Sequence, residues 1–433
     1  MKLAAGAFLG GAKSRLLPAS IPFRFFGAAV LFHLLGWMAL LAGASDFPRF
    51  QGGLGWPLAA LHLTTLGVLT MSVMGASLQL LPVATRQAVG STWLPAAIWW
   101  LHSFGVAAIA LGMGRAMPLA LAAGAVAVTA ALLVFAGLLA GNLVGARSMP
   151  EVICFGWASL GSLLVVLISA LSLVFAYLGL PLLGRGAGLS LHIVFAVYGF
   201  MGLLAMGMSL ILIPMFSLSG PIDSRRAIVS CALAVIALTL AAGAAFGIAP
   251  VALNALALLV GLGAVSMHLQ QMLVALRTGM RRDLGQSFVL VRFGWAMLMT
   301  SLLLAMALTL DLPLAGLPTL FGLVLIGGWL LSFLFGILRR VLPFLGSMHV
   351  TGRGKRPPTP SSLSATQPLS IHFHCHLVAV AGLALAVLLD QPMIALLSAT
   401  VGTIGAGAFA VFFTVLLLRI RSNHSSPAAA TRV

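Results

Sequence analysis

The segment MGASLQLLPV, residues 74–83, recurs twice in altered form further along the chain. The related segments are MGMSLILIPM at 206–215 and FGILRRVLPF at 335–344. Each contains a glycine followed seven residues later by a proline, and the three glycines are 132 and 129 residues apart. Self-similarity at a nearly constant period indicates a repeated structural unit. The sequence therefore predicts three related units.

The chain is too apolar for a soluble domain. Of its 433 residues, 61% are hydrophobic and only 7% are charged, whereas soluble domains carry roughly a quarter charged residues. A helix of about 20 apolar residues spans a bilayer, and such segments occur near 21–44, 56–82, 93–113, 116–144, 154–180, 189–216, 227–247, 249–275, 287–310, 315–342, 371–389 and 391–418. We expect an all-α membrane protein with twelve transmembrane helices.

The repeated segments fall at the ends of the second, sixth and tenth predicted helices. The whole chain is then a single membrane domain of three four-helix units, at about 21–144, 154–275 and 287–418. Residues 345–370 are rich in Pro, Ser and Thr, a composition typical of loops. We predict a flexible cytoplasmic loop there and a cytoplasmic tail at 420–433.

The basic residues are distributed unevenly between the two ends of the predicted helices. With the N-terminus in the cytoplasm, all but three of the 23 lysines and arginines fall on the cytoplasmic side, and only Arg49, Arg115 and Arg185 fall outside. This bias predicts a multi-pass membrane protein with both termini in the cytoplasm, and the family resemblance described below implies the bacterial inner membrane. The net charge of +17 then reflects topology, so we expect contact with the lipid bilayer and no nucleic-acid partner.

Two histidines stand near the predicted outer ends of the second and sixth helices. His62 begins a polar stripe that continues through Thr65 to Gln79. His192 begins a stripe with two glycines, which leave room for a flat group or for a closely packed helix. A polar side chain inside a bilayer either binds a functional group or makes a hydrogen bond between helices. Both interpretations stay open for both histidines.

Twelve helices in three four-helix units resemble subunit I of the haem–copper oxidases, in which helices 2, 6 and 10 are related by pseudo-threefold symmetry. The chain is also similar in size and plan to the NnrS family, twelve-helix proteins tied to the nitric oxide response of denitrifying bacteria. In the oxidases the helix-2 histidine binds low-spin haem and the helix-6 histidine binds copper. The resemblance implies that His62 binds haem, of b type, with His192, His102 or His33 as the second ligand, and that copper is a further candidate cofactor.

The oxygen-reducing centre of the oxidases needs further histidines that this chain lacks. Those enzymes carry two in helix 7 and a pair near the outer end of helix 10, whereas the segments predicted here at 227–247 and 315–342 have none. The resemblance therefore implies a haem-binding or haem–copper protein of the nitric oxide response or of respiratory metabolism, without a complete oxygen-reducing centre. Respiratory or denitrification proteins would be its partners.

The run HFHCH at 372–376 opens the eleventh predicted helix. His372 and His376 are four residues apart and share a helix face, which is a chelating spacing, whereas His374 points elsewhere. His268, at the cytoplasmic end of the eighth helix, is expected at the same depth. Zinc or copper would suit such a site. The alternative is that these histidines face headgroups and water at the membrane surface.

Two other functions remain open at this point. The polar stripe of the second helix and the deeper histidines, His33 and His102, would line the path of a transporter for a small molecule, a metal or haem. The same scaffold without cofactors would serve as an assembly subunit, because a fold does not determine a function.

Overall fold

Lipid offers the backbone no hydrogen-bond partner, so long apolar segments fold as helices. The computed structural model describes residues 17–85, 91–146, 148–180, 182–350 and 358–425. Within those residues it has twelve helices that are long and apolar enough to cross a membrane, and it has no β-strand. The predicted all-α membrane protein with twelve spans is therefore confirmed.

Each unit has four spans, and the second span of each is built from three consecutive segments. The first unit contains α2 (Ser20–Ala42), the 3₁₀ turn η2 (Phe47–Arg49), α3 (Trp56–His62), η3 (Leu63–Thr70), α4 (Met71–Thr85), α5 (Trp93–Gly114) and α6 (Pro118–Gly145). The second contains α7 (Pro150–Ala176), α8 (Arg185–Val194), η4 (Phe195–Gly202), α9 (Leu203–Ser217), α10 (Ser224–Ala245) and α11 (Pro250–Thr278). The third contains α12 (Gly285–Thr309), α13 (Leu317–Leu323), η5 (Val324–Leu331), α14 (Ser332–His349), α15 (Pro360–Leu363), α16 (Thr366–Leu388) and α17 (Pro392–Ser425).

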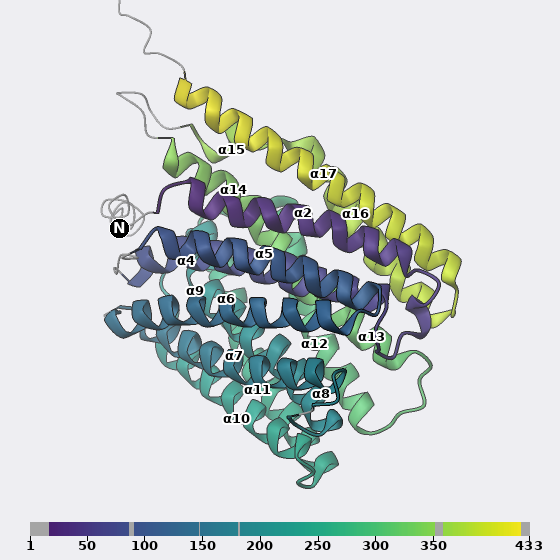
Figure 1. The fold of residues 1–433 in the computed structure, drawn as a ribbon. Helices are drawn as coiled ribbons and strands as arrows, with labels where there is room; N and C mark the ends of the chain where they lie inside the picture. The colour runs from purple at the N-terminus through teal and green to yellow at the C-terminus, as the bar shows by residue number, and fades with distance from the viewer. Residues whose placement is uncertain (1–16, 86–90, 147, 181, 351–357, 426–433) are drawn as a thin grey trace, which may run out of the picture.

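The second, sixth and tenth spans form the centre of the bundle. Their most apolar stretches are 83%, 83% and 67% buried, whereas no other span exceeds 50%. The third and fourth spans of each unit pack as pairs, α5 with α6, α10 with α11 and α16 with α17. The last span, α17, lies beside the first, α2, so the third unit closes onto the first (Figure 1).

Each central span contains eight residues of π-helix. The segments η3, η4 and η5 begin 132 and 129 residues apart, the spacing of the repeated sequence segments. Both η3 and η4 contact η5 in the middle of the bundle. Since π-helix is rare and occurs mostly as single turns within α-helices, the sequence repeat corresponds to a repeated and unusual backbone geometry.

A glycine in each π-helix lets the central span pack closely on the first span of its own unit. Gly67, Gly199 and Gly328 stand eight residues before the glycines of the repeated segments, so each repeat reads G-x7-G-x6-P. A β-carbon added at any of the three would lie closer than 3 Å to a side chain of α2, α7 or α12. The contacts are Gly67 with Phe32 at 2.6 Å, Gly199 with Ser162 at 2.7 Å and Gly328 with Met297 at 2.9 Å.

The interval 345–370, predicted as a flexible loop, contains more helix than the sequence indicates. It holds the end of α14, the short helix α15 and the start of α16, while residues 351–357 lie outside the described residues. Thr359 caps α15, and Arg419 of α17 donates to the carbonyls of Ser362 and Ser364. These local bonds order residues that composition alone assigns to a loop. The predicted tail at 420–433 likewise begins as helix, since α17 runs to Ser425, and residues 426–433 lie outside the described residues.

The tenth span also runs further than predicted, to His349. Arg339 and Arg340, expected near the end of that helix, therefore lie inside it. Arg339 donates to the side chain of Gln286, at 2.7 Å, and Arg340 donates to the carbonyl of Leu284. Both bonds join α14 to the start of α12, so the guanidinium groups are hydrogen-bonded within the bundle.

An exposed ion pair joins two connections at the other end of the bundle. Arg49 in η2 donates to Asp390, which lies between α16 and α17, with Nε 2.8 Å from Oδ1. This hydrogen bond from Arg49 lowers the pKa of the Asp390 carboxyl below its ordinary value of 3.8. Because both side chains are solvent-exposed, we expect the pair to contribute little stability.

The lowered pKa of Asp390 makes the contribution of this pair depend on pH. The contribution of the pair to the free energy of unfolding is fully present above pH 3.8. It is lost as the pH falls through the lower pKa that Asp390 has in the folded state. We expect the Asp390→Asn variant to melt slightly below the wild type at neutral pH and at the same temperature in strong acid. Thermal unfolding in detergent at both pH values checks this, with Asp46→Asn as the control. An equal difference at both pH values would contradict the assignment.

The glycine contacts predict a second stability difference. Gly67→Ala places a methyl group against Phe32, and such overpacking costs on the order of 1–3 kcal/mol. Gly137→Ala on α6 is the matched control, because its added methyl meets no atom within 4 Å. We expect a lower melting temperature for Gly67→Ala only. Equal melting temperatures would show that the close approach of α2 is not needed.

Candidate functional site

His62 and His192 meet between the second and sixth spans. His62 is the last residue of α3, and His192 stands three residues before η4, so each lies just outside a π-helix. Their ring centroids are 6.3 Å apart and the ring planes differ by 15°. Both side chains are half-buried. The structure thus brings together the two histidines that the sequence puts forward first.

A backbone carbonyl fixes the tautomer of His62. Its Nδ1 lies 3.0 Å from the carbonyl oxygen of Leu58 and donates to it, so Nε2 keeps its lone pair. Histidines that ligate metals usually donate their other ring nitrogen in this way. The Nδ1 of His192 is buried without a hydrogen-bond partner. The pair can therefore present two imidazole nitrogens, and in known zinc sites such nitrogens lie about 2.0–2.1 Å from the metal.

His102 is hydrogen-bonded to the backbone of the first π-helix. This fully buried side chain donates from Nε2 to the carbonyl of Leu66 in η3, at 3.1 Å. Within the same segment, Thr70 donates to the carbonyl of Thr65 at 2.8 Å. Only Nδ1 of His102 remains without a partner, and its observed bond is a hydrogen bond between two helices.

The third π-helix has an equivalent arrangement with one added link. Ser332 gives its single proton to the carbonyl of Gly327, at 3.0 Å. His376 must therefore be the donor in its 2.7 Å bond to the same hydroxyl. Gly327 occupies the position of Leu66 in the third repeat, so histidines from α5 and α16 support the same carbonyl in the first and third units.

The second π-helix uses a serine. Ser159 of α7 donates to the carbonyl of Phe200 in η4, at 2.9 Å. The corresponding third helix of this unit, α10, has no histidine. Each π-helix thus has a side chain hydrogen-bonded to one of its carbonyls.

Three histidines form a buried cluster around Phe335 of α14. His33 of α2 and His376 of α16 have ring centroids 5.7 and 5.9 Å from that of His372. The Phe335 ring lies 4.5 Å from both His33 and His372, and each histidine is at most 3% exposed. Both ring nitrogens of His372 lack a partner, although burial of an unpaired polar group costs roughly 1–3 kcal/mol.

The interpretation of the HFHCH run as a membrane-surface feature is therefore wrong for two of its histidines. Because α16 begins at Thr366 and not at residue 371, His372 and His376 lie more than one turn inside the helix. They turn toward α2 and α14, where they are buried.

The other two predicted metal ligands lie apart from this cluster. His374 is exposed and its Nδ1 bonds the carbonyl of Ser370 at 2.9 Å. His268 donates from Nε2 to Ser209 at 2.9 Å and packs on Phe155, in the second unit. In the described part of the chain, no three His, Cys, Asp or Glu side chains are grouped so that they could hold a metal ion. The structure therefore does not assemble the predicted set of four histidines.

Comparison with known proteins identifies the fold. No protein-family model and no curated relative matches the sequence. Among solved structures, a cryo-EM structure of a haem–copper terminal oxidase dimer matches with a TM-score of 0.63, covering 95% of this chain and 85% of that chain at 12% identity. The fold is oxidase subunit I-like. Three pseudo-threefold units of four helices are thereby confirmed, and the likeness at this identity is one of fold.

The role of His102 is testable by substitution. His102→Leu leaves the Leu66 carbonyl without its donor, which we expect to cost roughly 1–3 kcal/mol and to lower the melting temperature in detergent. His374→Leu is the control, because His374 is exposed. Metal content should be the same in both variants. Loss of metal from His102→Leu with unchanged stability would instead make His102 a ligand.

Proposed function

We propose that this protein is a metal-binding membrane protein on an oxidase-like scaffold, in which His62 and His192 hold a haem iron or a copper ion. The supporting observation is the pair of neighbouring, nearly parallel imidazoles, one of which has its Nδ1 engaged by the Leu58 carbonyl. Neutral imidazole is a common ligand for copper, zinc and iron. The similar oxidase is described as a haem–copper enzyme, which favours these two metals.

The proposal has two forms, a copper ion or a haem iron at His62 and His192. The two cavities described here measure about 70 and 10 Å³, and neither is lined by a histidine. Pockets for organic molecules are roughly 300–1,000 Å³. Neither of these cavities adjoins the histidine pair, so the visible spectrum described below distinguishes the copper form from the haem form.

The distribution of histidines supports a function without an oxygen-reducing centre. None occurs in α10, and the tenth span has one only at its last residue, His349. We therefore place the protein in the nitric oxide response or in respiratory metabolism, as its resemblance to the NnrS family implies, and not among oxygen reductases. The proposal includes a bacterial inner membrane location, cytoplasmic termini and respiratory or denitrification proteins as partners.

The test is a metal count and a visible spectrum of the detergent-purified protein, oxidised and reduced. We expect stoichiometric copper or iron in the wild type, and its loss in His62→Ala and His192→Ala. His374→Ala, which changes an exposed histidine, is the control and should keep the metal. Sharp reduced α and Soret bands would identify haem, and copper without them would identify the ion.

Two outcomes would contradict the proposal at different levels. A wild-type protein free of iron and copper would refute metal binding altogether. Loss of the metal in His372→Ala but not in His62→Ala would move the site to the buried cluster, where His372 has two unpartnered nitrogens.

A further inference from the structure

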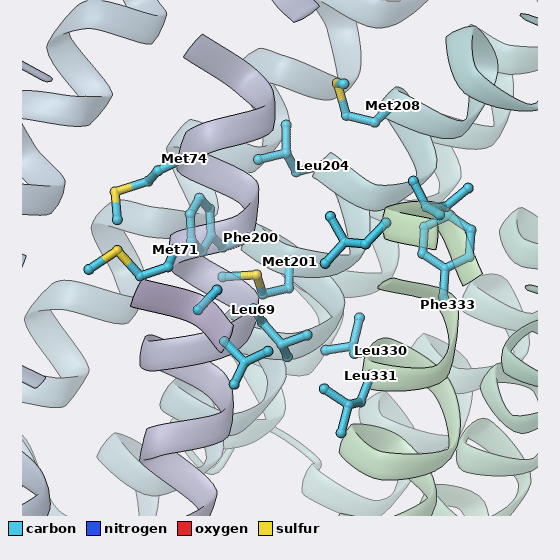
Figure 2. Packing of buried hydrophobic residues seen from close by; sticks show 14 of the residues in the cluster. Leu69, Met71, Met74, Phe200, Met201, Leu204, Met208, Leu330, Leu331 and Phe333 are labelled. Atoms are coloured by element: carbon cyan, nitrogen blue, oxygen red, sulfur yellow. The ribbon is translucent and has the colours of Figure 1, made fainter. Parts of the chain in front are cut away.

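A cavity of about 70 Å³ lies between the three central spans. Its lining comes from repeat-equivalent positions of all three, including the sets Leu69, Met201, Leu330 and Ala76, Met208, Ile337. Figure 2 shows Leu69, Met201, Leu204 and Leu330 converging from the three helices. The cavity therefore lies on the pseudo-threefold axis, where three π-helices and the turns that follow them meet.

The wall of this axial cavity presents only apolar surface. Ser72 and Ser77 contribute to the lining, but their hydroxyl oxygens are covered and make no hydrogen bond. A buried water needs two to four polar partners, and apolar cavities without them stay dry. The chemistry of the wall therefore favours an apolar occupant over water.

The size of the cavity limits that occupant. An apolar protein cavity of about 150 Å³ takes up benzene or xenon, and this one is about half as large, at about 70 Å³. A haem is too large for the space, whereas a xenon atom or a diatomic gas molecule is of suitable size.

We propose that the axial cavity is a binding site for a small apolar molecule of the size of a dissolved gas. The proposal does not depend on metal binding at His62 and His192.

A second, smaller cavity extends this site toward the buried histidines. It measures about 10 Å³, shares Ser72 with the axial cavity and is also lined by Phe335 and Phe409. The rings of those two phenylalanines lie 4.5 and 4.9 Å from that of His372. The smaller cavity thus adjoins two of the aromatic rings that pack on His372.

Xenon is the probe, because its anomalous scattering locates it among protein, detergent and lipid. Crystals of the full chain pressurised with xenon should show a peak within the axial cavity. Leu204→Ala, which removes a lining side chain, should strengthen that peak. Ala205→Leu should abolish it, since Ala205 lines the cavity, and Ala123→Leu on the exposed face of α6 should leave it unchanged.

Ala76→Leu fills the cavity from the second span and replaces Ala205→Leu if that variant does not fold. A wild-type crystal with xenon at other places but none on the axis would overturn the proposal. Density for an acyl chain or for ordered water in the cavity would also overturn it, as would a peak that persists in a well-folded Ala205→Leu protein.

Discussion

Backbone carbonyls inside a membrane protein need hydrogen-bond partners, and the three π-helices at the centre of this bundle make that requirement specific. A π-helix replaces the hydrogen-bond ladder of the α-helix with bonds between residues five apart, and lipid offers no partner to a carbonyl that this change leaves unpaired. The structure meets the requirement with side chains. His102 donates to Leu66, Ser159 to Phe200 and Ser332 to Gly327, with His376 donating to Ser332 in turn. Much of the polar chemistry in the interior therefore serves the backbone.

The buried histidines differ in which ring nitrogen is already hydrogen-bonded. His102 and His376 each use Nε2 to support a π-helix, and His268 uses Nε2 for Ser209. His62 differs, because its Nδ1 is engaged within its own helix and its Nε2 stays free. The position of His62 and His192 just outside η3 and η4 suggests a reason for the π-helices. An added residue in a helix turn changes the direction of the side chains before it, and here those side chains face each other.

The central spans pack closely on the first span of each unit because each repeat has two glycines, eight residues apart, that face that span. Gly67, Gly199 and Gly328 bring the π-helices against the first span of each unit. The axial cavity lies at the other side of these spans, where side chains such as Leu69, Met201 and Leu330 converge from all three. The repeat thus recurs both in the close glycine contacts and in the lining of the cavity.

The sequence by itself determined the number of spans, the three units and the equivalence of the second, sixth and tenth helices. Those features depend on local composition and on a period, both of which can be read along the chain. The sequence also contains the pattern G-x7-G-x6-P, which coincides with the π-helices and with the glycine contacts. Only the tertiary structure decided which histidines meet. His62 and His192 are 130 residues apart in the chain, and His33 and His372 come from the first and eleventh spans. Pairing at such separations depends on helix rotation and depth, which the bundle sets as a whole: α16 turns His372 toward α2 and α14, where it is buried.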